Sequence, residues 1–174
     1  MPWQPDSSDA AATSTTRYIR GVTTDVRWLD ATQQQAWRGF LDLHARLAAK
    51  LNRDLQQTSR LTLSDYDVLV HLTDVPDGRL RAFELGEGLQ WDKSRVSKQV
   101  TRLAARGLVA KEDCESDRRG AYVVLTEAGR QAIEAAAPAH VELVHRLVFD
   151  TLTPGQIREW AAISSAILRR IELD

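Results

Sequence analysis

The sequence is poor in residues that form cross-links and metal sites. Its 174 residues include one cysteine, one methionine and four histidines. A single cysteine excludes an intrachain disulfide and fits a reducing compartment. The histidines lack the i, i+4 spacing of a helical metal site, so we expect no structural zinc. The alternative is a metal-sensing site built from residues distant in sequence. The four histidines are His44, His71, His140 and His145.

The only cysteine, Cys114, lies between Asp113 and Glu115. Neighbouring carboxylates disfavour the thiolate form that a redox sensor requires. The sequence therefore predicts a passive thiol at this position.

Long hydrophobic runs and catalytic motifs are also missing. No apolar stretch approaches the ~20 residues of a membrane span. The first residues lack the basic and then hydrophobic regions that mark a protein for secretion. The G-x-S-x-G, H-E-x-x-H, P-loop and dinucleotide-binding patterns are absent as well. We therefore expect a cytoplasmic protein without membrane association, cofactor or enzymatic activity.

Charge is distributed unevenly along the chain. The formal net charge is -1, yet residues 79–106 carry seven Lys or Arg against three acidic residues. This segment is strongly positive, and the remainder of the chain is acidic overall. Such asymmetry gives one face that attracts polyanions without coating the whole protein in positive charge.

The basic segment contains an amphipathic helix pattern over residues 93–106. Asp92 is typical of an N-cap, and Gly107 is typical of the residue that ends a helix. The outer positions interleave Lys and Arg with Ser, Gln and Thr, which suits a helix laid in a DNA major groove. For this helix taken alone, the alternative is a charged face that contacts only water and binds nothing. The apolar stripe consists of Val96, Val100, Leu103 and Ala104.

The neighbouring segments complete a winged helix. Residues 83–89 predict a short helix and Gln90-Trp91 a turn, which together with the basic helix give a helix-turn-helix. Strands are predicted at 79–81 and 121–125, a third strand is predicted to start at 108–110, and a polar turn is predicted at 115–120. The expected fold is mostly α with a small antiparallel β-wing.

These residues resemble the MarR family of bacterial transcription regulators, from about Asp30 to the C-terminus. The resemblance implies a sequence-specific DNA-binding regulator, and the family commonly represses. Gly86 departs from the family's usual Ala and should loosen the short helix by up to about 1 kcal/mol. The matching residues are Glu84-Leu85, Ser94-Arg-Val-Ser-Lys98, Arg106-Gly-Leu-Val109, Asp117-Arg-Arg-Gly120 and Leu125-Thr-Glu-Ala-Gly129.

The helix pattern and the resemblance together predict the DNA-contacting residues. The wing arginine that enters the minor groove in the family corresponds to Arg119, which Asp117 is expected to brace. Arg118 is better placed for the DNA backbone. Within the helix, the first turns are expected to face bases, and Arg102 a phosphate. The predicted set is Lys93, Ser94, Arg95, Ser97, Lys98, Thr101, Arg102, Asp117, Arg118 and Arg119.

Four regions are predicted along the chain. Pro138 should kink or break the helix that is predicted from Thr126 to about Asp150, near residues 135–137. The terminal helices carry more apolar surface than a small domain covers, and in the MarR family they interleave between two subunits. We therefore expect a homodimer on a palindromic double-stranded DNA operator, with a monomer as the alternative. The regions are a flexible arm (1–26), a long dimerisation helix (27–60), the winged helix lobe (61–126) and C-terminal dimerisation helices (127–174).

The resemblance also implies a small aromatic or anionic effector. Many family members release DNA when such a ligand binds between the dimerisation helices and the DNA-binding lobe. Two alternatives to this regulator are a winged helix that binds another protein and a ligand- or metal-binding module whose DNA binding is secondary. Candidate lining residues are Trp37, His44, Arg46 and Tyr66, although core packing explains Trp37, His44 and Tyr66 equally well.

Overall fold

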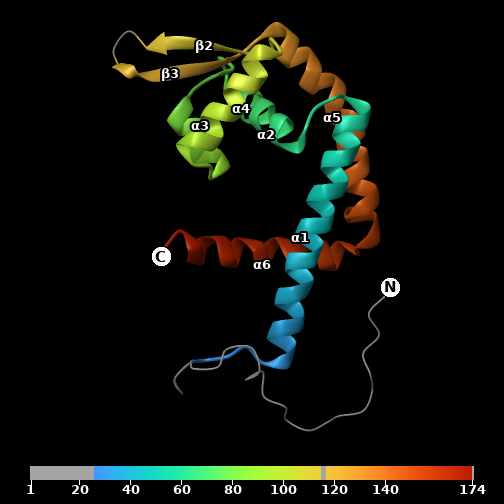
Figure 1. Ribbon diagram of the computed structural model, residues 1–174. Coiled ribbons are helices and arrows are strands. Elements are labelled where there is room, and N and C mark those ends of the chain that lie inside the picture. Colours follow the sequence, from blue (N-terminus) through green and yellow to red (C-terminus); the bar gives the residue numbers. More distant parts are fainter. Residues whose placement is uncertain (1–25, 115–116, 174) are drawn as a thin grey trace. The chain divides into compact units, whose positions relative to one another are not determined.

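The computed structural model describes residues 26–114 and 117–173, apart from the side chains of 113–120 (Figure 1). Residues 1–25 of the predicted arm lie outside this description. The chain divides into two compact units, residues 1–44 and 45–174. In chain order the elements are α1 (Ala31–Thr58), α2 (Leu63–Thr73), β1 (Arg79–Arg81), α3 (Ala82–Leu89), α4 (Lys93–Ala105), β2 (Val109–Cys114), β3 (Asp117–Leu125), α5 (Glu127–Leu147), the 3-10 helix η1 (Phe149–Thr151) and α6 (Pro154–Ile171).

Reciprocal capping hydrogen bonds begin helices α1 and α6. Before α1, the Gln33 amide donates to Asp30 Oδ1 at 2.8 Å, and the Asp30 amide donates to Gln33 Oε1 at 3.0 Å. Thr153 and Gln156 form the same reciprocal box before α6. Each box satisfies amides that have no partner within the helix. The helix starts were therefore readable from residues three positions apart.

The sheet is antiparallel, with β3 in the centre and the strand order β1-β3-β2. The predicted polar turn at 115–120 was too long, because β3 begins at Asp117, which pairs with Cys114. The register is irregular between Asp113 and Cys114. Polar residues were interpreted as a turn, but strand propensity depends strongly on context, and backbone pairing can continue through a polar segment. The wing is consequently longer than the sequence suggested.

One hydrophobic core holds the helix-turn-helix to the sheet. Val96, Val100 and Leu103 of α4 are at most 3% exposed, and Ala104, the fourth residue of the predicted stripe, is partly buried against the core. Full burial of such a side chain stabilises the fold by about 1.5–3 kcal/mol. The core residues are Leu55, Leu61, Val68, Leu69, Leu72, Leu85, Val96, Val100, Leu103, Leu108, Val109, Val123, Ile133 and Ala136.

Helix α5 runs through Pro138 and ends at Leu147, before the expected Asp150. The predicted break is therefore wrong, and its alternative, a kink, stays a prediction. Proline removes one backbone donor, so the cost is local. Burial of Ile133 and Ala136 before the proline and of Leu143 after it holds both halves of the helix. Tertiary packing therefore overrides the helix-breaking tendency.

Gly86 has a packing role that the sequence did not reveal. It is buried in α3, and a Cβ there would lie 3.1 Å from the Trp91 carbonyl oxygen and 3.3 Å from Val96 Cγ2. The glycine thus permits a close approach between α3, the turn and α4. Its helix-propensity cost is offset by this contact.

Candidate nucleic-acid interface

Helix α4 presents one face to the core and the other to solvent. Asp92 caps it, with Oδ1 accepting from the Arg95 amide at 2.9 Å. Gln90 has φ 54° in the connection before it, and Gly107 has φ 71° after it, so both ends turn sharply. The burial of the apolar stripe turns the polar positions outward. The exposed residues include every predicted α4 contact: Lys93, Ser94, Arg95, Ser97, Lys98, Thr101 and Arg102.

Arg95 is oriented by an aromatic ring. Its Cζ lies 4.0 Å from the ring centroid of Trp91, a cation–π geometry that restrains the long side chain. Burial raises the pKa of Asp67 on α2, while the positive charges of His71 and Arg95 oppose that rise. Arg95 is therefore held against the Trp91 ring at the start of the exposed helix.

A buried carboxylate contacts the other side of α4. Asp65 on α2 completes a capping box with Thr62. Its side chain is also only 1% exposed and pairs with Arg102 at 2.7 Å and Arg106 at 3.0 Å. Gln99 donates to the same carboxylate at 2.7 Å. Sequence reasoning missed this network.

A signal for the network does exist in the sequence. Gln99, Arg102 and Arg106 are spaced i, i+3 and i+7, so they share a side of α4. Asp65 is the capping-box acid of α2. Their partnership was not predictable, because it depends on how α2 and α4 cross. The phosphate contact predicted for Arg102 stays untested, but its guanidinium already has intramolecular acceptors.

The helix and the wing are joined on the solvent side. Lys111 of β2 donates to Thr101 Oγ1 at 2.7 Å, and that hydroxyl donates to the Ser97 carbonyl at 2.8 Å. Thr101, predicted to contact DNA, is thus exposed but already bonded to the wing strand. This contact keeps a lysine of the sheet beside the outer face of α4.

The outer strands carry further cations. Arg79 Cζ lies 3.8 Å from the Tyr122 ring centroid, and Arg81 Cζ lies 5.1 Å from it. Arg79 also pairs with Glu112 at 3.1 Å. The side chains of Asp117, Arg118 and Arg119 lie outside the described part, and their backbone belongs to β3. The predicted bracing of Arg119 by Asp117 stays a prediction.

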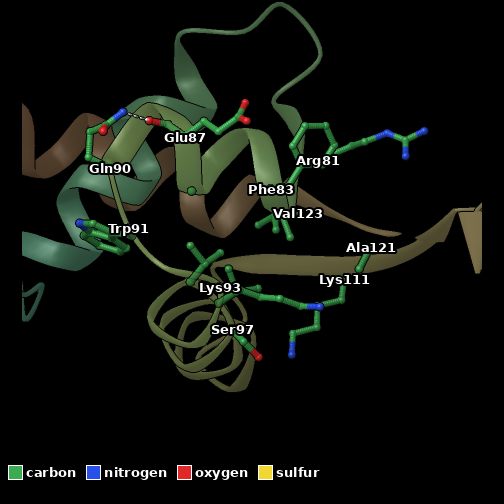
Figure 2. Close-up of a pocket in the computed structure, with 14 residues that line it drawn as sticks. Arg81, Phe83, Glu87, Gln90, Trp91, Lys93, Ser97, Lys111, Ala121 and Val123 are labelled. Atoms are coloured by element: carbon green, nitrogen blue, oxygen red, sulfur yellow. Dashed lines mark hydrogen bonds between the residues drawn. The ribbon is translucent and has the colours of Figure 1, made fainter. Parts of the chain in front are cut away.

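A cavity of about 710 Å³ lies between α3, α4 and the sheet (Figure 2). Phe83, Trp91 and Val123 give it apolar walls, while Lys93 and Lys111 supply positive charge. Because Trp91 also stacks on Arg95, one ring connects the cavity to the exposed face of α4. The arrangement can hold a planar apolar molecule that carries a negative charge.

The residues predicted to line an effector pocket have other neighbours. Trp37 and His44 each stack on Phe40, with ring centroids 5.7 and 6.2 Å away. Tyr66 lies against His140, with ring centroids 4.3 Å apart. Burial lowers the pKa of His140, and the negative charge of Asp54 opposes this shift. The effector site predicted from Trp37, His44, Arg46 and Tyr66 stays a prediction.

The described residues form neither a metal-binding cluster nor a membrane-spanning helix. Within residues 26–114 and 117–173, no group of three or more His, Cys, Asp or Glu is arranged to hold a metal ion. In the same part of the chain, no helix combines the length and hydropathy needed to cross a bilayer.

The known proteins that resemble this chain include several transcriptional regulators. A model of the MarR family matches residues 61–120. The structure of AbsC, a MarR family transcriptional regulator from Streptomyces coelicolor, is 38% identical, covers 86% of this chain and 100% of that chain, and has a TM-score of 0.79.

Two further relatives extend the comparison. Sco3205, a MarR family transcriptional regulator from Streptomyces coelicolor, was solved in complex with DNA; it is 36% identical over 84% of this chain and 91% of that chain, with a TM-score of 0.79. The uncharacterized HTH-type transcriptional regulator YxaD from Bacillus subtilis (strain 168) is 27% identical over 103 residues, which are 59% of this chain and 71% of YxaD.

Proposed function

Because this chain belongs to the MarR family of transcriptional regulators, and is therefore not an enzyme, we propose that it is a homodimeric repressor of a palindromic DNA operator. The observation that carries the proposal is the exposed basic face of α4, which the buried stripe of that helix turns outward. The relative Sco3205, solved with DNA, supports it. Such a repressor acts in the cytoplasm, where its operator lies.

The proposed contacts divide by role. Ser94, Arg95, Ser97 and Lys98 face the major groove, where Lys98 also neutralises a phosphate, and Lys93 lies next to them at the start of α4. In the wing, Arg119 enters the minor groove, where a guanidinium is favoured by a narrow A/T-rich sequence. Asp117 braces Arg119, and Arg118 approaches the backbone.

The exposed apolar faces support a dimer. Helix α6 has no buried residue, and Ile163, Ile167 and Ile171 are 58%, 56% and 64% exposed. In α1, Trp37 and Phe40 are 53% and 56% exposed. Monomeric proteins rarely leave contiguous apolar faces in water. A second copy of the chain would cover them and place two recognition helices on the two halves of a palindrome.

The proposal is tested by selecting bound fragments from a random duplex pool and measuring their affinity at two salt concentrations. A DNA-binding repressor should enrich a palindrome and weaken steeply as salt rises, because phosphate contacts release counterions. A winged helix that serves only to bind another protein would enrich no sequence. That outcome would overturn the proposed function.

Arg95→Ala should relax sequence preference at one position of each half-site, at a cost of about 1–3 kcal/mol on the preferred base. The stacking of Arg95 on Trp91 orients the guanidinium before DNA arrives, so its loss removes a directed contact. Binding is measured on operators carrying each base at every position. A uniform loss across the panel would show that Arg95 contacts only the backbone.

We also propose that the effector is a small aromatic anion that binds in the cavity between α3, α4 and the sheet, in place of the site predicted from Trp37, His44, Arg46 and Tyr66. The apolar walls suit a ring, and Lys93 and Lys111 suit a carboxylate. A ligand that displaced the Trp91 ring would release Arg95 from its stacked pose. Effector binding would thereby change the orientation of Arg95, a proposed base-reading residue.

Ala121→Phe should fill this cavity and abolish effector-driven release while operator binding is retained. Ala121 lies in the cavity wall on β3 (Figure 2), and an aromatic side chain is compatible with a strand. A panel of aromatic carboxylates is screened for release of labelled operator from the parent and the variant. Ala110→Phe on the neighbouring strand, outside the cavity wall, is the control. Equal release from Ala121→Phe and the parent would place the effector elsewhere.

A further inference from the structure

We infer that Asp65 is a positioning residue for DNA recognition, which holds α4 in place and withholds Arg102 and Arg106 from the DNA backbone. The inference rests on the proposed function. It assigns specificity to a residue of α2 whose side chain is 1% exposed and therefore does not itself reach DNA.

The carboxylate of Asp65 is saturated. Oδ1 accepts from Gln99 Nε2 at 2.7 Å and from Arg102 at 2.7 Å. Oδ2 accepts from the Thr62 amide at 2.8 Å and from Arg106 at 3.0 Å. A carboxylate offers about four lone-pair sites, so these four donors use its full capacity. No side chain without both oxygens and the charge reproduces this arrangement.

The same arginines reach the connection between α1 and α2. Arg102 donates to Thr62 Oγ1 at 2.8 Å, and Arg106 donates to the Arg60 carbonyl at 2.9 Å. Arg60 has φ 57°, an uncommon conformation for a residue with a Cβ, so the chain turns sharply here. The Leu63 amide donates to Asn52 Oδ1 of α1 at 2.9 Å. The network therefore connects α4 to the end of α1.

Two consequences follow for DNA binding. Contacts on one side of α4 restrain its rotation about its own axis, which sets the direction in which Arg95 and Lys98 point. Base readout needs such restraint, because recognition groups must be held close to their productive geometry. In addition, a guanidinium that donates to a buried carboxylate has less charge to offer a phosphate. Among the described residues, the cations of α4 that carry the salt dependence are then those that do not donate to a buried carboxylate, such as Lys98.

The test compares Asp65→Asn, Arg102→Ala and the matched control Lys98→Ala with the parent in the full-length protein. Anisotropy measures affinity for the selected operator and for a scrambled duplex of equal length, from about 50 to 200 mM salt. Circular dichroism of each variant reports whether it is folded.

Arg102→Ala should leave the slope of log affinity against log salt unchanged, whereas Lys98→Ala should flatten it by about one for each protomer. Asp65→Asn frees two guanidiniums. It should therefore steepen the slope, tighten binding to the scrambled duplex and lower the ratio of operator to scrambled affinity at least tenfold.

Three results would overturn the inference. Arg102→Ala could flatten the slope as Lys98→Ala does, which would make Arg102 a phosphate contact. A folded Asp65→Asn could weaken both duplexes equally at an unchanged slope, which would make Asp65 merely structural. If Asp65→Asn fails to fold, the slopes of Arg102→Ala and Arg106→Ala decide instead. A parent that binds no duplex would overturn the proposed function first, and this inference with it.

Discussion

Replacing Gly129 by alanine should destabilise the protein by about 3 kcal/mol or more, or prevent folding. A Cβ at this position would overlap the carbonyl oxygen of Leu108 and lie 2.8 Å from Leu125 Cδ1. Neither the Leu108 carbonyl nor the Gly129 backbone can move freely. The Leu108 carbonyl accepts from the Thr126 amide at 3.2 Å, and the Gly129 amide donates to Thr126 Oγ1 at 3.0 Å. These hydrogen bonds thus join the start of α5 to the start of β2 at the place where the added methyl group would lie.

Urea unfolding followed by far-ultraviolet circular dichroism measures the effect. Gly155→Ala is the control, because the nearest atom to a Cβ there is Thr153 Oγ1 at 3.8 Å. It lies in the first turn of α6, and its stability should change by no more than about 1 kcal/mol. If both variants unfold at the same urea concentration as the parent, the close packing at Gly129 is not a constraint on the fold.

The double variant Ile163→Glu/Ile167→Glu should convert the proposed dimer to a monomer and weaken operator binding by about a hundredfold or more. Two carboxylates would have to be buried without partners in an apolar interface, which is costly. A monomer also loses the gain from binding two half-sites at once, commonly about 10²–10⁴ in affinity.

Sedimentation of the parent at low micromolar concentration should give a species near twice the 19.5 kDa chain mass. The double variant should sediment at the chain mass. Ser165→Glu adds a carboxylate to the exposed opposite side of α6 and should leave the dimer intact. A parent that sediments as a monomer, or a double variant that stays dimeric, would contradict the proposed interface.

Local sequence patterns determined most of the fold. The Asp30, Thr62, Asp92, Thr126 and Thr153 caps place the starts of five helices within a residue or two, because cap hydrogen bonds span only three positions. The stripe of α4 determined which of its residues are exposed, because helical periodicity orients side chains. These features were predictable because each depends only on residues a few positions apart in the sequence.

Predictions failed where local composition competed with pairing or packing. The polar residues before Gly120 resemble a turn, yet β3 begins at Asp117 because the ladder with β2 continues that far. Pro138 resembles a helix break, yet α5 continues through it with core contacts on both sides. In both cases a longer-range interaction outweighed a single-residue preference.

Only the tertiary structure decided which residues meet across the fold. Asp65 binds Arg102 and Arg106, 37 and 41 positions away, because α2 and α4 cross at that point. Gly129 is required because α5 begins against the Leu108 carbonyl, and the cavity exists because α3, α4 and the sheet leave space between them. The sequence by itself determined the helices, their polar faces and the basic segment. Which charges are buried depends on how the elements pack, and no local pattern carries that information.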